Sequence, residues 1–120
     1  MIAGVLDIYI EQGTTWSIDL TIQQSNGQPM DLTGYTGRCQ IRSSAISQTI
    51  FASPAVTVTD AKNGKLTISL TADETAAIPV NGGSYSSVSQ YVYDLELVDG
   101  MGRVMRLLNG YARISPEVTK

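Results

Sequence analysis

Apolar and polar residues alternate along much of this chain, and a period of two is typical of half-buried β-strands rather than of helices. The clearest run is Trp16–Gln23, in which every second side chain is apolar. Three further segments repeat the alternation, namely Leu6–Ile10, Leu66–Leu70 and Tyr91–Leu97. The pattern predicts that the apolar residues of these segments face a core, among them Leu6, Ile8, Ile10, Trp16, Ile18, Leu20, Ile22, Tyr91, Tyr93, Leu95 and Leu97.

Glycine-containing turns separate the predicted strands. Every asparagine of the chain precedes a glycine, and Asn-Gly is the favoured two-residue hairpin connection because both residues tolerate positive φ. Asn63-Gly64 is predicted to form such a hairpin, and Asp99–Gly102 to form a second one. Asn109-Gly110 falls inside the last strand, where the glycine indicates a bulge. Thr49–Phe51 is expected to add a short edge strand.

One short helix is expected over residues 72–78. Thr71 and Glu74 have the spacing of a capping box, and Pro79 ends the segment. A helix of two turns at most connects strands and does not form a layer of the fold. We therefore predict an all-β chain, a single domain over residues 1–120, built as an antiparallel sandwich of about seven or eight strands. A small barrel is the alternative.

The amino-acid composition restricts the possible functions more than it restricts the possible folds. The chain of 120 residues has no histidine, one cysteine, 16% charged residues and a net charge of −3. Without histidine there is no imidazole base, and one cysteine allows neither an internal disulfide nor a cysteine-based zinc site. The acidic balance argues against nucleic acid and anionic lipid as partners. We expect no catalytic residue, cofactor or metal, and no signal peptide, because Met1–Asp7 lacks a basic start.

Two carboxylates, Asp94 and Glu96, share one face of a predicted strand. Such a pair could hold a cation or act as an acid and a base. The alternative is a solvated strand face whose charges are answered by Arg103, Arg106 or Arg113. Because no other residue completes a site, the sequence favours the solvated face.

Arg38 and Arg42 flank Gln40 on the outward side of another predicted strand. They could pair with carboxylates of a partner protein, although pairing within the domain to Asp19 or Asp31 is favoured. The terminal stretch Ile114–Lys120 extends past the last strand, where it either reaches a neighbour or frays.

A candidate interaction loop follows the predicted helix. It is rich in the residue types that antibody loops use for adaptable contact. Its residues are Asn81, Gly82, Gly83, Ser84, Tyr85, Ser86 and Ser87. The alternative is a flexible loop whose Tyr85 packs against its own domain.

A candidate structural turn precedes the strand that contains Arg38. Asp31 or Thr33 can bond backbone N–H groups there, and Gly34 can take positive φ. Tyr35 is then expected to anchor the turn in the core.

Several segments together carry a family resemblance. They are Ile10–Thr15, Met30–Thr36, Arg38–Arg42, Gly64–Thr71, Tyr93–Leu97, Gly102–Val104 with Gly110, and Ser115–Thr119. The chain is similar to small tailed-bacteriophage virion proteins, which resemble the immunoglobulin-like N-terminal domain of baseplate upper proteins. The resemblance implies an immunoglobulin-like sandwich without catalytic residues. It also implies other phage structural proteins as partners, in symmetric copies, within a virion assembled in the bacterial cytoplasm.

Three hypotheses about function follow. The first is a non-enzymatic structural subunit that packs on the tail, baseplate or neck of a phage, or as a variant decorates its capsid. The second is a carbohydrate- or receptor-binding module, which the inward placement of Trp16 disfavours. The third is a hydrolase that uses Asp94 and Glu96, the pair for which the sequence offers no supporting residue.

Overall fold

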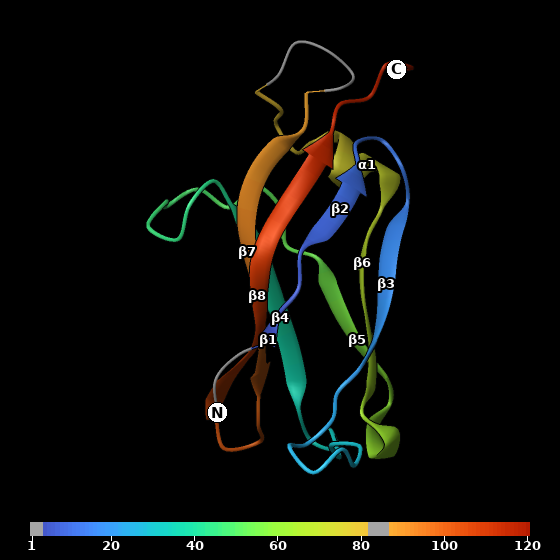
Figure 1. Ribbon diagram of the computed structural model, residues 1–120, viewed down its shortest axis with the longest axis vertical. Coiled ribbons are helices and arrows are strands. Elements are labelled where there is room, and N and C mark those ends of the chain that lie inside the picture. Colours follow the sequence, from blue (N-terminus) through green and yellow to red (C-terminus); the bar gives the residue numbers. More distant parts are fainter. Residues whose placement is uncertain (1–3, 82–86) are drawn as a thin grey trace.

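The computed structural model describes residues 4–81 and 87–120, which form two β-sheets packed face to face (Figure 1). The three-stranded sheet has the order β3 (Trp16–Thr21), β6 (Lys65–Leu70) and β5 (Ala55–Asp60). The five-stranded sheet has the order β1 (Gly4–Val5), β8 (Val104–Ser115), β7 (Ser89–Val98) and β4 (Thr36–Arg42), with β2 (Ile8–Glu11) also paired to β8. The predicted all-β sandwich is confirmed, and it is not the alternative barrel.

The strand order is that of an immunoglobulin-like domain. Strands β3, β6 and β5 occupy the places of strands B, E and D, and β4, β7 and β8 those of C, F and G. Tyr91, near the start of β7, donates its hydroxyl to the carbonyl of Pro79 at 2.6 Å. This bond resembles the tyrosine corner of immunoglobulin folds, which ties the start of strand F to the chain before it.

The first two strands depart from the antiparallel prediction. Strands β1 and β2 both run parallel to β8, with Gly4 opposite Leu108 and Ile8 opposite Ala112. Between them the chain leaves the sheet at Leu6, whose carbonyl accepts a hydrogen bond from the Tyr93 hydroxyl. The prediction that Leu6 faces the core is therefore wrong, since its side chain is exposed.

Gly110 allows this crossing, because a Cβ at position 110 would lie 2.3 Å from the carbonyl oxygen of Leu6. The predicted bulge lies elsewhere: Leu95 pairs with Leu108 and Glu96 with Arg106, which leaves Leu107 as the extra residue. The glycine therefore serves a close backbone approach and not the bulge.

The core lies between the sheets and follows the alternation read from the sequence. Side chains of both sheets are fully buried there, among them Ile10, Ile41, Leu66, Ile68, Leu95, Leu97 and Ile114. Trp16 is buried as predicted, and its indole N–H donates to the Tyr9 carbonyl at 2.8 Å. Burial raises the pKa of the Cys39 thiol to about 12, so this cysteine is an unreactive part of the core.

Helix α1 (Ala72–Ala76) begins with the predicted capping box. The Glu74 N–H donates to Thr71 Oγ1 at 3.1 Å, and the Thr71 N–H donates to Glu74 Oε1 at 2.8 Å. The helix ends two residues before the predicted end, because the chain turns to bury Ile78 completely.

The predicted hairpin between β5 and β6 forms, but not through a two-residue turn. The connection is the 3-10 helix η1 (Ala61–Asn63) followed by Gly64, which alone takes a positive φ of 69°. A Cβ at position 64 would lie 2.4 Å from the Ile22 carbonyl oxygen, so a glycine is required there. The predicted edge strand at Thr49–Phe51 is also wrong, since that region contributes only an isolated bridge between Ile41 and Ala52.

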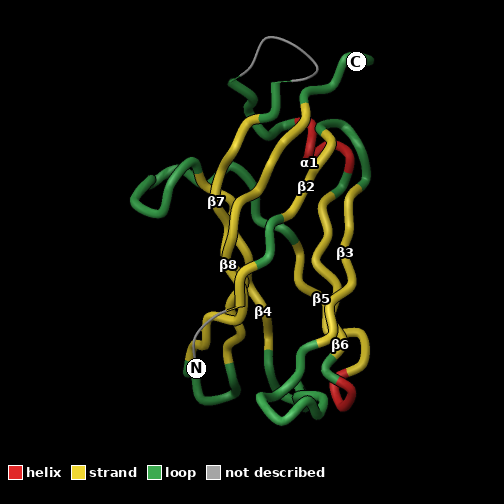
Figure 2. Tube along the Cα trace, in the orientation of Figure 1, coloured by secondary structure: helices red, strands yellow, loops and turns green. Residues whose placement is uncertain are grey.

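Connections gather at the two ends of the sandwich and on one side (Figure 2). Helix α1 and the described C-terminal residues lie at one end, and the turns near η1 lie at the other. An arm formed by residues 43–50, which joins β4 to the segment before β5, projects to the side of the five-stranded sheet.

Candidate interaction surfaces

The two outer faces of the sandwich differ in chemistry. The outer face of the five-stranded sheet, here the charged face, consists of Arg38, Gln40, Arg42, Val92, Asp94, Glu96, Arg106, Asn109, Tyr111 and Arg113. The outer face of the three-stranded sheet, here the hydroxyl face, consists of Ser17, Asp19, Thr21, Ala55, Thr57, Thr59, Lys65, Thr67 and Ser69. Each face uses the alternate residues of strands whose other residues form the core.

On the charged face, the two predicted carboxylates have arginine partners. Arg38 Nε lies 2.7 Å from Glu96 Oε1, and Arg106 Nε lies 3.6 Å from Asp94 Oδ2. The favoured solvated face is thus observed, with Arg106 as one of the predicted partners. Arg103 instead pairs with Asp99, and Arg113 with Asp7.

The prediction that Arg38 and Arg42 pair with Asp19 or Asp31 is wrong. Asp19 lies on the opposite outer face, where it accepts a hydrogen bond from Thr67 Oγ1 at 2.7 Å. Arg42 donates to the Ser47 carbonyl at 2.7 Å and to Gln40 Oε1 at 2.8 Å, and so fastens the arm to β4. The sequence could not place these pairs because they depend on which sheet each strand joins.

The pKa of Asp94 is raised above its ordinary value. Partial burial is the main cause and the neighbouring Glu96 adds to it, while Arg106, Arg38 and Arg42 act in the opposite direction. Among the described residues, no hydrogen bond reaches the Asp94 carboxylate. Its ion pair to Arg106 therefore leaves hydrogen-bonding capacity open.

A second cluster surrounds Arg113 at the edge of the charged face. Its guanidinium carbon lies 5.5 Å from the ring centroid of Tyr9 and 5.4 Å from that of Tyr111. Asp7 accepts from Arg113 Nη1 at 2.8 Å and from the Tyr111 N–H at 3.1 Å, and these bonds lower the pKa of Asp7. The cluster holds two exposed aromatic rings in fixed positions, a feature that the sequence analysis did not single out. The sequence does carry one sign of this cluster, because Tyr9 occupies an outward position in the alternating segment Leu6–Ile10.

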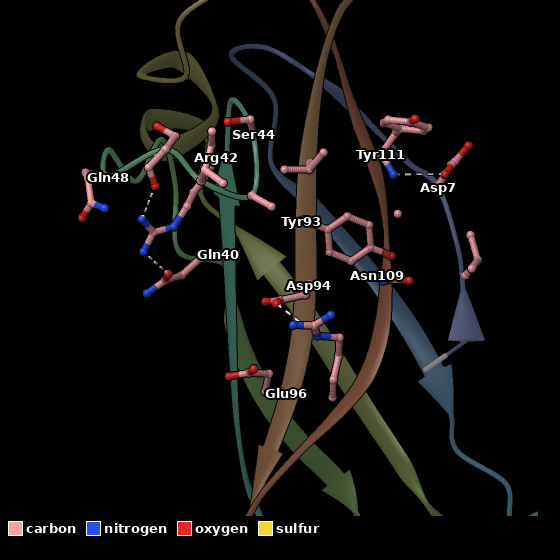
Figure 3. Close-up of a pocket in the computed structure, with 17 residues that line it drawn as sticks. Asp7, Gln40, Arg42, Ser44, Gln48, Tyr93, Asp94, Glu96, Asn109 and Tyr111 are labelled. Atoms are coloured by element: carbon pink, nitrogen blue, oxygen red, sulfur yellow. Dashed lines mark hydrogen bonds and ion pairs between the residues drawn. The ribbon is translucent and has the colours of Figure 1, made fainter. Parts of the chain in front are cut away.

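A groove of about 860 Å³ runs across the charged face between the arm and β1. In Figure 3, Gln40 and Arg42 lie on one side of it, Asn109 and Tyr111 on the other, and Asp94 between them. The exposed Ile46 of the arm and Val5 of β1 add apolar walls.

The hydroxyl face is built from short side chains in register. One row across the sheet is Ser17, Ser69 and Ala55, and the next is Asp19, Thr67 and Thr57. Asp19 and Lys65 are the charged residues of this face. The side chains are exposed or half-buried, so the face is open to a partner.

The candidate interaction loop lies mostly outside the described residues, since Gly82, Gly83, Ser84, Tyr85 and Ser86 are not described. Asn81 is tied to β7, because its N–H donates to Ser89 Oγ at 2.9 Å and its Oδ1 accepts from the same hydroxyl. Ser87 is half-buried. Contact by this loop stays a prediction.

At the candidate structural turn, the backbone N–H and the hydroxyl of Thr33 both donate to Asp31 Oδ1, at 2.9 and 2.6 Å. These bonds lower the pKa of Asp31. Gly34 has a φ of 82°, and the half-buried Tyr35 packs against the core. The turn thus has the local geometry expected of it, and it lies at the opposite end of the sandwich from the loop at Asn81.

The C-terminal stretch is held as far as Glu117. Its N–H donates to Gln12 Oε1 at 3.0 Å, while Gln12 Nε2 donates to the Ile78 carbonyl at 2.9 Å. The Glu117 carboxylate lies over Gly13, where a Cβ would come within 2.0 Å of it. Gln12 therefore joins the tail, the turn before β3 and the segment after α1.

No group of three or more metal-ligating side chains occurs among residues 4–81 and 87–120. Over the same residues, no helix has the length and apolar character needed to cross a membrane.

The strand order and the corner at Tyr91 define an immunoglobulin-like β-sandwich. Residues 4–78, more than half of the chain, match the family model of the BppU N-terminal domain. The chain belongs to this family, that of the N-terminal domain of the baseplate upper protein, and is a phage baseplate structural protein. A search of curated protein sequences finds no match.

Three solved structures illustrate distant similarity to this chain. Murine CRIg has 7% identity and a TM-score of 0.40, over 93% of this chain and 92% of that one. The extracellular domain of the voltage-gated sodium channel beta4 subunit has 9% identity and a TM-score of 0.37, over 98% and 97%. A family 123 glycoside hydrolase from Clostridium perfringens has 10% identity and a TM-score of 0.36, over 98% of this chain but 24% of that one. These TM-scores are below 0.5, so we base neither fold nor function on them.

Proposed function

We propose that this chain is a non-enzymatic subunit that packs in symmetric copies on the phage baseplate, with its hydroxyl face against a neighbouring structural protein. Family membership supports the baseplate and a virion assembled in the host cytoplasm. The open, nearly uncharged rows of serine and threonine on β3, β6 and β5 are the observation that carries the choice of face.

The hydroxyl face is the one that a neighbouring protein can cover at the lower cost in free energy. Serine and threonine lose less rotamer freedom on burial than lysine, arginine or glutamate. Each hydroxyl can donate and accept, so it can find a partner in an interface without leaving a buried charge unpaired. Short side chains on a sheet also let a second β surface approach closely. The partner is therefore expected to present a flat and similarly uncharged surface.

The proposal can be tested by placing a charge on the hydroxyl face, on its strand β5. Thr57→Arg, made in the phage, is expected to lower the amount of this chain in purified particles by about tenfold or more, because an unpaired buried charge costs several kcal/mol. Thr57→Ala is the matched control and is expected to assemble normally. Quantitative mass spectrometry of the particles measures both.

Two results would contradict the proposal. One is normal incorporation of Thr57→Arg, provided that circular dichroism shows the purified variant to be folded. The other is a label on the chain that electron microscopy locates away from the baseplate. A label on the phage head would favour the capsid decoration hypothesis, and a label on the neck would favour the neck.

A further inference from the structure

The groove on the charged face has a row of polar groups along its floor. Strand pairing sets Gln40 of β4 opposite Asp94 of β7, and Asp94 opposite Asn109 of β8. An amide, a carboxylate and a second amide therefore stand side by side across three strands, at the spacing of neighbouring strands. Figure 3 shows the three side chains along the groove.

These groups have hydrogen-bonding capacity to spare. Gln40 accepts from Arg42 through Oε1, which leaves its two N–H donors. Within the described part of the chain, no hydrogen bond occupies the side-chain amide of Asn109 or the carboxylate of Asp94. The floor thus offers donors and acceptors that a ligand can use without breaking a bond of the fold.

The next row up supplies an apolar platform. Val92 lies opposite Tyr111 on β8. Tyr111 as a residue is 44% exposed, and the Arg113 guanidinium lies over its ring. Saccharides combine hydroxyl groups, which carboxylates and amides bind, with apolar C–H faces, which pack on aromatic rings. We propose that this groove binds a short oligosaccharide, with Asp94, Gln40 and Asn109 bonding its hydroxyls and Tyr111 packing on one ring.

The geometry favours a saccharide over a peptide. An extended peptide adds to a sheet through free backbone groups at an edge, whereas β7 is paired on both sides and the floor of the groove consists of side chains. A peptide would therefore lack its main source of hydrogen bonds here.

The charges around the groove are nearly balanced. The groove is lined by three carboxylates, Asp7, Asp94 and Glu96, and by the two guanidinium groups of Arg42 and Arg106. Arg113 pairs with Asp7 and Arg38 with Glu96, so the charges suit a ligand that is itself largely uncharged. The volume of about 860 Å³ lies within the range of known small-ligand sites.

The inference concerns the face opposite to the one that the proposed function uses, so each can fail without the other. The direct test applies the full-length chain, at about 100 µM, to an array of neutral, amino-sugar and uronic-acid oligosaccharides. Retained oligosaccharides are then titrated into ¹⁵N-labelled chain, and amide shifts are mapped. We expect saturable binding, with shifts centred on residues 92–94 and 109–111.

Two variants and one control locate the site. Asp94→Asn keeps the shape of the side chain but replaces an anionic acceptor, and Tyr111→Ala removes the platform. Each is expected to weaken binding by about tenfold or more. Thr57→Ala on the hydroxyl face is expected to bind as the unchanged chain does.

Three outcomes would overturn the inference. They are an array that retains no oligosaccharide, binding that neither variant weakens, and shifts confined to another surface. Loss of Asp94→Asn or Tyr111→Ala from particles, without any saccharide binding, would also overturn it and would assign the groove to a protein partner. Circular dichroism of both variants separates loss of binding from loss of fold.

Discussion

The charged face and the hydroxyl face belong to the same sandwich, yet they are organised in different ways. On the charged face, long side chains are fixed by ion pairs such as Arg38 with Glu96, and by the stacking of Arg113 between two tyrosines. On the hydroxyl face, Thr67 donates to Asp19 in the one side-chain hydrogen bond between strands that the described residues form there, and the other side chains are mostly short. The long side chains of one face are thus held by internal bonds, whereas the short side chains of the other face are held by few such bonds.

The two faces are also suited to different tasks. A face with a groove and fixed rings can select a small ligand, because its groups are held before the ligand arrives. A flat face of hydroxyls has little shape with which to select, but it can be covered at low cost in side-chain entropy. This difference between the two faces is expected to be confined to the outer surfaces of the sandwich.

The largest effects are expected inside, where the two sheets should behave alike. Ile68→Ala and Leu95→Ala each remove a fully buried side chain, one from each sheet. Each is expected to lower the free energy of unfolding by about 2–5 kcal/mol. Urea denaturation measures both, with Thr57→Ala as the control, for which a change within about 0.5 kcal/mol is expected. A loss below about 1 kcal/mol for either core variant would contradict a shared core.

A smaller effect is expected where the N-terminal segment is fastened beside the charged face. Tyr93→Phe removes the hydroxyl that donates to the Leu6 carbonyl, and an unsatisfied carbonyl costs about 1–2 kcal/mol. Urea denaturation gives the stability, and hydrogen exchange should show weaker protection of β1 and β2. Tyr111→Phe is the control, because the Tyr111 hydroxyl makes no hydrogen bond to any of the described residues. Equal stability of the two variants would show that the Tyr93 hydroxyl does not fasten this segment.

The charged face should make stability sensitive to acid. Bonds from Tyr111 and Arg113 lower the pKa of Asp7 in the folded chain. A lowered carboxyl pKa stabilises the fold above the unfolded value of 3.8, and this contribution disappears as the pH falls through the lower folded value. Asp7→Asn should therefore be less stable than the unchanged chain at pH 7, and the difference should shrink below pH 3.8. A constant difference across urea curves at several pH values would refute this assignment.

Asp94 should show the opposite sign and the smallest effect. Burial raises its pKa in the folded chain, so its ionisation opposes folding above the unfolded value of 3.8. Asp94→Asn is expected to be slightly more stable than the unchanged chain at pH 7 and to lose this advantage as the pH falls. Thermal melts at pH 7 and pH 3 measure the change. A variant that is destabilised at pH 7 would mean that the Arg106 ion pair outweighs the cost of burial.

The sequence predicts the sandwich because its strands alternate regularly. Trp16, Ile68 and Leu95 point inward as the period of two requires, and the capping box at Thr71 fixes where α1 begins. The same local reasoning fails at Leu6 and at Asn63-Gly64. There the outcome depends on distant backbone, namely the approach of Leu6 to Gly110 and of Gly64 to Ile22.

The candidate surfaces were less predictable than the fold. Alternation shows that Asp94 and Glu96 share a face, but not that Gln40 and Asn109 flank Asp94, because this requires the strand order and register. For the same reason, the sequence favours Asp19 or Asp31 as the ion-pair partner of Arg38. The structure instead pairs Arg38 with Glu96 on the neighbouring strand. Pairing between strands far apart in sequence is thus the information that the residues alone did not supply.

Cysteine protection tests most directly the central claim that the hydroxyl face is covered in the particle. Thr57→Cys and Arg38→Cys place one thiol on each outer face, and Cys39 stays silent because its burial raises its pKa to about 12. In assembled particles, a maleimide reagent is expected to modify Thr57→Cys about tenfold or more slowly than in the free chain, and Arg38→Cys at a similar rate in both. Equal rates for Thr57→Cys in the particle and in the free chain would contradict the claim.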